Sequence, residues 1–239
     1  MIAAALALTG CGGSQPLGVA PSASTAAPPE TPAEQLLGRV AAAKDARYVA
    51  TYTLRRKGQP DRTVTVTLAA DGGWRFDVPG GAHGGKRDVT LASDGKGVYQ
   101  CVPKSCIRLS GAGGRVPAAY DVRVQRPFTD WLDVLADTRA ALSVAADTTF
   151  SVPAGDCYSV EPNAAALAPP MDPGIYCFDT EGVLTGARFS GRTLVISGAA
   201  GKPPATLKLP APITGGHALS TSPPPPPSPK PSASPSKSG

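Results

Sequence analysis

The distribution of apolar residues changes period along the chain. Behind the segment Thr31-Pro-Ala-Glu34, apolar residues recur at helical spacing through Leu37 and Val40. A threonine followed three residues later by a glutamate forms a capping box, and proline is favoured in the first turn of a helix. The sequence therefore predicts a first helix from Pro32 to Lys44.

From Tyr48 onward apolar and polar residues alternate, which is the pattern of a half-buried strand. Val64, Val66 and Leu68, for example, alternate with threonines, and Asp71-Gly72-Gly73 is a hairpin turn signal. Pro79 to Gly85 is interpreted as a glycine-rich loop. The segments predicted as strands are 48–55, 63–68, 74–78, 88–92, 97–101, 149–152, 156–160, 175–179, 183–190, 192–197 and 205–209.

A second helix is predicted to open at Pro127, with Thr129 as its cap, and to end near Leu142. Apolar residues recur at helical spacing between these points. Two amphipathic helices and many antiparallel strands predict an α+β fold, in which a long curved sheet carries both helices on its apolar face.

Composition divides the chain into a folded part and two polar ends. Four of the 27 prolines lie in residues 12–30 and eight lie in residues 220–239, whereas every Trp, Tyr and Phe lies between. Residues 11–30 are interpreted as a disordered linker, residues 31–219 as the folded domain and residues 220–239 as a disordered tail. Pro223 to Pro227 favours polyproline II, either as a wall-contacting rod or as an inert solubilising tail.

Charge and hydropathy exclude several classes of protein. A net charge of +5 is too small an excess to indicate a nucleic-acid partner. The absence of an apolar run of about 20 residues excludes an integral membrane protein. With two histidines and no clustered acids, neither a metal site, a cofactor nor an enzymatic function is expected.

The first eleven residues end in Leu8-Thr9-Gly10-Cys11 after an apolar stretch, which resembles the bacterial lipobox. Residues 1–10 are therefore expected to be a signal peptide, and Cys11 to carry acyl chains on the outer face of the cytoplasmic membrane. Two or more acyl chains give stable anchoring. No Lys or Arg precedes Arg39, so the charged start of the signal is expected further upstream. The alternatives are a secretory signal with a chance cysteine, or a buried start of the fold.

Four cysteines remain after Cys11. An exported chain meets an oxidising compartment, so they are expected to pair. The expected disulfides are Cys101–Cys106, around a turn with Pro103, and Cys157–Cys177, between two antiparallel strands. The alternative is a four-thiolate zinc site, which the long second spacing disfavours.

The order of the hairpin motifs is similar to that of the LolA-like carriers, in particular the actinobacterial lipoproteins of the LppX and LprG type. The motifs are Arg55-Arg-Lys-Gly58, Asp71-Gly-Gly-Trp-Arg-Phe76, Asp94-Gly-Lys-Gly-Val-Tyr99 and Tyr176-Cys-Phe-Asp-Thr-Glu-Gly-Val-Leu184. The resemblance implies a half-barrel whose concave face, lidded by helices, takes acyl chains of lipids or lipoproteins.

Ten side chains are the candidates to line such a cavity, and the alternative is that they form an ordinary core. They are Tyr52, Leu54, Val64, Val66, Leu68, Trp74, Phe76, Phe128, Trp131 and Leu135. The expected function is lipid or acyl-chain carriage by a monomeric membrane-anchored lipoprotein. The alternative is a non-catalytic interaction or sensor lipoprotein with a filled core.

Two basic segments and one acidic set have competing interpretations. Arg55–Lys57 with Arg62 either contacts anionic lipid head groups or is a solvated hairpin end. His83 with Lys86 and Arg87 is either an anion-binding glycine loop or a mobile loop. Asp130, Asp133 and Asp137 are interpreted as a solvated helix face.

Overall fold

The computed structural model of the chain describes residues 29–163 and 169–223. These residues form two α-helices, three short 3-10 turns and eleven strands. In chain order they are α1 (Pro32–Asp45), β1 (Tyr48–Arg56), β2 (Arg62–Leu68), β3 (Trp74–Ala82), η1 (His83–Gly85), β4 (Arg87–Ser93), β5 (Gly97–Val102), β6 (Ser105–Gly111), η2 (Ala118–Tyr120), η3 (Arg126–Phe128), α2 (Asp130–Ala136), β7 (Leu142–Asp147), β8 (Asp156–Pro162), β9 (Gly174–Phe178), β10 (Leu184–Phe189) and β11 (Arg192–Ile196).

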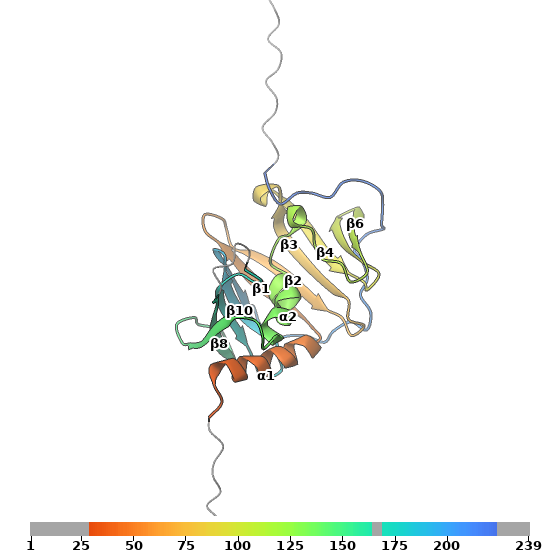
Figure 1. Cartoon of the computed structure of the whole chain (residues 1–239). Coiled ribbons are helices and arrows are strands. Elements are labelled where there is room, and N and C mark those ends of the chain that lie inside the picture. Colours follow the sequence, from red (N-terminus) through yellow and green to blue (C-terminus); the bar gives the residue numbers. More distant parts are fainter. Residues whose placement is uncertain (1–28, 164–168, 224–239) are drawn as a thin grey trace, which may run out of the picture. The chain divides into compact units, whose positions relative to one another are not determined.

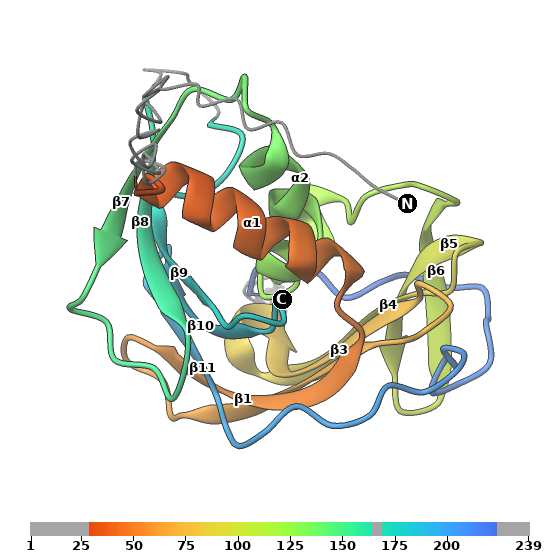
Figure 2. The same ribbon diagram turned by 90° about the horizontal axis from the view of Figure 1, so that it is seen from below.

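The described strands make a single antiparallel sheet in the order β6-β5-β4-β3-β2-β1-β11-β10-β9-β8-β7. Two meanders, β1 to β6 and β7 to β11, are joined where β1 pairs with β11, with Tyr52 opposite Ile196. The sheet curves around α1 and α2, which lie on its concave side (Figures 1 and 2). The predicted α+β half-barrel is confirmed.

Helix α1 begins with the predicted capping box. The Thr31 hydroxyl accepts a hydrogen bond from the Glu34 N–H at 3.3 Å, and the Glu34 carboxylate accepts one from the Thr31 N–H at 2.8 Å. The second bond lowers the pKa of Glu34. The helix buries Leu36, Val40 and Ala43 against the sheet.

A glycine sets how closely α1 approaches the sheet. Gly182 has a φ of +79°, and a β-carbon there would lie 2.3 Å from the backbone nitrogen of Ala43. Any other residue would therefore push the last turns of α1 away from the turn between β9 and β10. The last turns of α1 therefore pack directly against the Gly182-Val-Leu184 turn noted in the sequence.

The strand alternation predicted for β1 to β3 is confirmed by burial. Ala50 pairs with Val66, and Tyr52 pairs with Val64, so the apolar sets of the two strands share one face. The buried Tyr52 hydroxyl donates to the Leu184 carbonyl at 2.7 Å, which ties β1 to β10 inside the core.

Both predicted disulfides are present, and each joins directly opposed residues of neighbouring strands. Cys101–Cys106, the hairpin disulfide, links β5 to β6 with a sequence separation of 5. Cys157–Cys177, the loop disulfide, links β8 to β9 with a separation of 20. Each therefore holds the register of an outer hairpin of the sheet.

The second helix is much shorter than predicted. α2 ends at Ala136, because Asp137 turns extended and its carboxylate accepts the Arg139 N–H at 3.0 Å. Leu142, expected near the helix end, instead begins β7. Thr129 does not cap α2, since its hydroxyl donates to the Gln125 carbonyl.

Three further predictions of local structure are wrong. Residues 149–152 are not a strand, because the Asp147 carboxylate accepts the N–H groups of Thr149 and Phe150 and ends β7. Residues 205–209 are not a strand either; they belong to a proline-rich strap that reaches the sheet through a bond from the Leu207 N–H to Asp71. Pro79–Ala82 is not loop but the end of β3, beyond an irregularity in its pairing with β4.

The folded domain continues past residue 219. The carbonyls of Ser220 and Thr221 accept the N–H groups of His83 and Gly84, and the Thr221 N–H donates to Ala119. Cys11 and most of the predicted linker and tail lie outside the described residues. Within the described part, no helix is long and apolar enough to cross a membrane, and no group of three or more potential metal ligands occurs.

Candidate functional site

An open crevice lies where the end of α1, the start of α2 and the turn between β2 and β3 meet. Its volume is about 280 Å³. The apolar part of its lining comes from Leu68 and Trp74 on the sheet side and from Phe128 and Leu132 on the helix side. We refer to this hollow as the helix crevice.

The helix crevice opens on a run of aromatic rings that leads into the core. Trp74 and Phe76 have ring centroids 5.4 Å apart, and Phe76 and Phe128 are also 5.4 Å apart. Phe128 meets Tyr52 edge-on at 5.3 Å. Such aromatic pairs contribute about 0.5–1.5 kcal/mol each beyond their burial, so the floor of the crevice is stabilised by the ring contacts.

The rim of the helix crevice is polar and contains an ion pair between the two helices. Lys44 of α1 donates to the Asp133 carboxylate of α2 at 2.7 Å. The two side chains are 45% and 70% exposed, so the pair contributes about 0–1 kcal/mol. Asp133 was interpreted as part of a solvated face; it is exposed, but it also bridges the helices.

A second hollow lies between α1, the end of α2 and β7. Its volume is about 210 Å³, and Leu36, Leu37 and Leu135 contribute to its lining, together with Leu142 and Val144. Leu132 lines the helix crevice and Leu135 lines this second hollow, so successive turns of α2 face the two openings. α2 is therefore the element that bounds both of them.

The structure places the ten candidate cavity residues in one hydrophobic cluster. Leu68, Trp74 and Phe128 reach the helix crevice and Leu135 reaches the second hollow. The other six are packed in the interior and are at most 1% exposed: Tyr52, Leu54, Val64, Val66, Phe76 and Trp131.

Sequence reasoning missed several residues of these hollows. Lys44 and Asp133 gave no signal, because their contact joins two helices that are far apart in the chain. Leu142 and Val144 are not recognised as lining residues when the second helix is predicted to extend to Leu142, because β7 is then missing from the prediction. A strand signal was available there, since Leu142 and Val144 are separated by one polar residue.

The buried tyrosines beside this site are neutral. Burial raises the pKa of Tyr48 to about 12, raises that of Tyr52 well above its ordinary value, and raises that of Tyr176 as well. Tyr52 and Tyr176 donate to backbone carbonyls of Leu184 and Asp172, each at 2.7 Å. These hydroxyls stabilise the core as hydrogen-bond donors.

Comparison with known proteins gives little further guidance. No family model matches the chain, and no curated protein matches it. Among solved structures, the crystal structure of LprF from Mycobacterium bovis is similar over 76% of this chain and 100% of that chain, with 13% identity and a TM-score of 0.38. Nothing about ligand or activity follows from a likeness of this degree.

Proposed function

We propose that this chain is a lipid-anchored protein of the outer face of the cytoplasmic membrane, and that its domain binds an acyl chain in the helix crevice without catalysing a reaction. The observation that carries the proposal is the continuity between the apolar part of the crevice lining and the aromatic run behind it, from Trp74 through Phe76 to Phe128. An apolar chain entering there would meet rings and methyl groups and leave its polar end at the Lys44–Asp133 rim.

The size of the helix crevice limits what it takes. Its volume of about 280 Å³ lies at the lower end of the roughly 300–1,000 Å³ typical of small-molecule sites. A single chain end fits this space better than a lipid with several long chains. An acyl chain could enter further than the crevice floor only if α2 moved away from the sheet.

α2 is a short helix whose polar contacts are weak. It has seven residues, and Thr129 at its start makes no side-chain cap bond. The ion pair that links it to α1 is largely exposed. The apolar side of α2 is held in the core by Trp131, Leu132 and Leu135, which are at most 7% exposed, so displacement of α2 to deepen the crevice would have to break these contacts.

The anchoring part of the proposal depends on the sequence Leu8-Thr9-Gly10-Cys11. The two disulfides support it, because paired cysteines are typical of proteins outside the cytosol. Residues 12–28, which lie outside the described part, have the composition of a tether between the acylated cysteine and the domain.

The chain offers its own probe for acyl binding, since it has two tryptophans. Trp74 lines the crevice, whereas Trp131 is 1% exposed and packs against Tyr176 and Phe189. Titration of the full chain carrying Cys11→Ala with a fatty acid should shift the tryptophan emission to the blue. The shift should persist in Trp131→Phe and vanish in Trp74→Phe; a shift that persists in Trp74→Phe would place the ligand elsewhere.

A second candidate function is favoured by the filled interior. Six of the ten candidate cavity residues are packed inside the core, which suits a domain that docks to another envelope protein and carries nothing. Native mass spectrometry of the full Cys11→Ala chain, exported from an actinobacterial host, separates the two functions. Co-purifying lipid supports carriage, whereas an unliganded mass in repeated preparations supports docking.

A further inference from the structure

Two arginines of like charge face each other at the end of the sheet remote from the helix crevice. Arg56, the last residue of β1, is paired in register with Arg192, the first residue of β11. Like charges directly opposite each other across two strands destabilise a sheet. Arg56 belongs to the basic hairpin end Arg55–Lys57, whereas Arg192 lies on a strand that is distant in the sequence.

Nearby carboxylates compensate this pair only in part, since Asp172 and Asp121 attract Arg192 without forming an ion pair with it. Those at this end of the domain are already engaged by other arginines: Asp88 by Arg62 at 4.0 Å, Asp121 by Arg126, and Asp172 by Arg123 at 3.0 Å. In residues 29–163 and 169–223, neither Arg56 nor Arg192 has an ion pair.

Both guanidinium groups have N–H groups that remain available to a ligand. Arg56 makes only long bonds, from Nη2 to the carbonyls of Pro79 at 3.4 Å and Gly80 at 3.3 Å. Arg192 donates from Nη1 to the Ser190 carbonyl at 3.2 Å, and its Nε is buried without a partner in the described part. Burial is the main cause that lowers the pKa of both groups; neighbouring arginines act in the same direction, whereas Asp172 and Asp121 act in the opposite direction on Arg192. An arginine nevertheless stays charged at any ordinary pH.

Both arginines line a cleft of about 370 Å³. Its walls include the glycine-rich end of β3 and η1, together with Ala118, residues 121–124 and residues 221–222. The Asp121 carboxylate is part of this lining and is engaged by Arg126. Gly80 has a φ of +61°, and a β-carbon there would lie 2.6 Å from the Arg62 Cζ, so only glycine lets that guanidinium lie against the backbone. The backbone bonds of Ser220 and Thr221 hold this segment against η1 and Ala119 beside the cleft.

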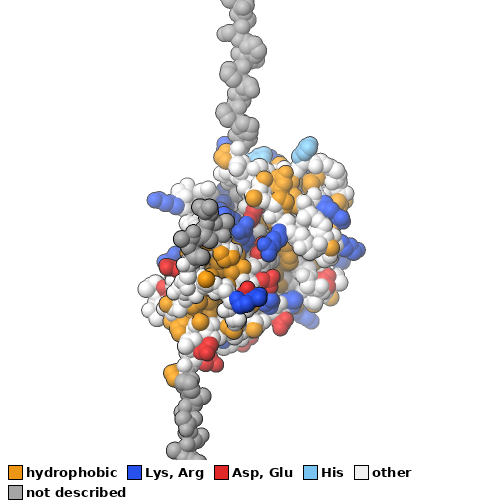
Figure 3. Space-filling model, viewed as in Figure 1, with side chains coloured by type: hydrophobic (Ala, Val, Ile, Leu, Met, Phe, Trp, Pro, Cys, Tyr) orange, Lys and Arg blue, Asp and Glu red, His pale blue; other side chains and the backbone are white. Residues whose placement is uncertain are grey.

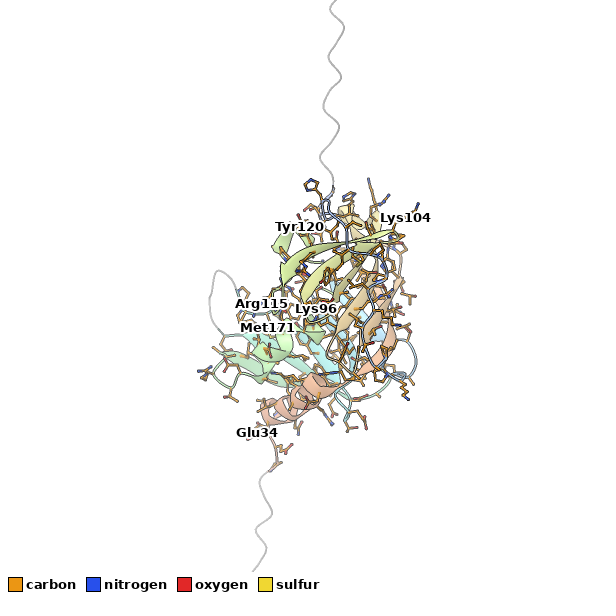
Figure 4. The ribbon with its side chains drawn as sticks, turned by 90° about the vertical axis from the view of Figure 1, so that its right-hand side faces the viewer. Glu34, Lys96, Lys104, Arg115, Tyr120 and Met171 are labelled. Atoms are coloured by element: carbon orange, nitrogen blue, oxygen red, sulfur yellow. A yellow bond between two sulfur atoms is a disulfide. The ribbon has the colours of Figure 1, made fainter. Side chains whose placement is uncertain are left out.

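The cleft is separate from the helix crevice. Tyr48 pairs with Leu68 at the crevice end of β1 and β2, and Leu54 pairs with Arg62 at the other end. Glu34 at the start of α1 and Tyr120 beside the cleft lie at opposite ends of the domain (Figure 4). Lys and Arg side chains are spread over the face seen in Figure 3, and some of them lie below the point where the described chain ends.

We propose that this cleft binds a phosphate group, with Arg56 and Arg192 as its paired charge donors. A guanidinium matches the oxygens of phosphate with two parallel N–H bonds. A doubly charged oxyanion between the two groups would convert their repulsion into attraction and use the donors left over. The phosphate belongs either to a lipid head group or to a soluble ligand.

Inorganic phosphate and lipid vesicles are the probes, and the full chain carrying Cys11→Ala is the protein. Phosphate should raise the Tm above that in chloride of the same ionic strength, and Arg192→Gln should weaken phosphate binding about tenfold or more. Because the variant also removes a repulsion, it should be no less stable than the parent in chloride alone. If Arg192 served only to stabilise the fold, Arg192→Gln would lower the Tm in chloride and leave phosphate binding unchanged.

Arg139→Gln is the matched control. It removes the same charge at a side chain that is 90% exposed and paired with Asp137. A phosphate response that is lost in Arg192→Gln and kept in Arg139→Gln supports the site. An equal response in the parent and both variants reflects general salting-out by phosphate and overturns the proposal.

Vesicles identify the source of the phosphate. Binding to phosphatidylglycerol but not phosphatidylcholine vesicles, reduced in Arg192→Gln and not in Arg139→Gln, identifies a lipid head group. If phosphate binds in the Arg192-dependent way and vesicles do not, the ligand is a soluble phosphate compound. The proposal does not depend on acyl binding, because the Trp74 emission shift should be unchanged in Arg192→Gln.

Discussion

Replacing Phe128 by alanine should weaken the fold and strengthen acyl binding at the same time. The Phe128 side chain is 6% exposed, lines the helix crevice and contacts the rings of Tyr52 and Phe76. A buried Phe→Ala change costs about 3–5 kcal/mol. The lower value is expected here, because the vacated space joins an open hollow that water can fill.

The consequence for stability is measurable by calorimetry. For a domain of 150–250 residues each kcal/mol moves the Tm by about 2–4 °C, so the Tm should fall by roughly 6–12 °C. The vacated volume should admit about two to three further methylene groups of a bound chain. At about 0.8 kcal/mol each, they correspond to binding that is tighter by about thirtyfold for the longer chains.

The assay is the tryptophan emission titration with fatty acids of increasing length. Leu54→Ala is the control, since Leu54 is 1% exposed in the same cluster but does not line the crevice. It should lower the Tm without changing the preferred chain length. If Phe128→Ala also lowers the Tm and leaves the chain-length preference unchanged, the helix crevice is not the acyl site.

Three other predictions concern the cross-links, the tyrosines and the anchor. Replacing both cysteines of the loop disulfide by serine should cost about 3 kcal/mol in urea unfolding and the same change at the hairpin disulfide about 2 kcal/mol; the reverse order would contradict the loop-entropy argument. Burial raises the pKa of Tyr48 to about 12, so between about pH 10 and 12 the unfolded chain loses the phenolic proton first and stability should fall as pH rises. A phenolate absorbance titration in which every tyrosine ionises with a midpoint near pH 10, while circular dichroism remains native, would refute that linkage. Cys11→Ala should move the chain from the membrane fraction to the soluble fraction of exporting cells, and retention on membranes would disprove acyl anchoring.

Local signals were sufficient where the stabilising contacts are themselves local. The α1 start follows from Thr31 and Glu34, which bond to each other within one turn. The hairpins of β1 to β3 follow from period-two alternation and an Asp-Gly-Gly turn, because neighbouring strands pair through contacts close in sequence. The disulfide pairs followed in the same way from adjacent strands.

Local signals failed where distant parts of the chain compete for the same backbone groups. The periodicity of α2 continues past Ala136, yet pairing of β7 with β8 takes the following residues. The apolar residues of 205–209 suggested a strand, but β1 already pairs with β2 and β11, and the strap that follows touches the sheet only at isolated points.

The sequence by itself determined α1, most of the strands with their hairpin turns, and the cysteine pairs, since each depends on groups within a few residues or on one adjoining strand. Only the tertiary structure decided that β1 and β11 are neighbours, which joins the two meanders into one sheet and brings Arg56 opposite Arg192. It likewise decided which apolar side chains fill the core and which line the helix crevice. The physical reason is that both depend on the register of the whole sheet and on where α1 and α2 rest against it, and no short stretch of residues encodes either.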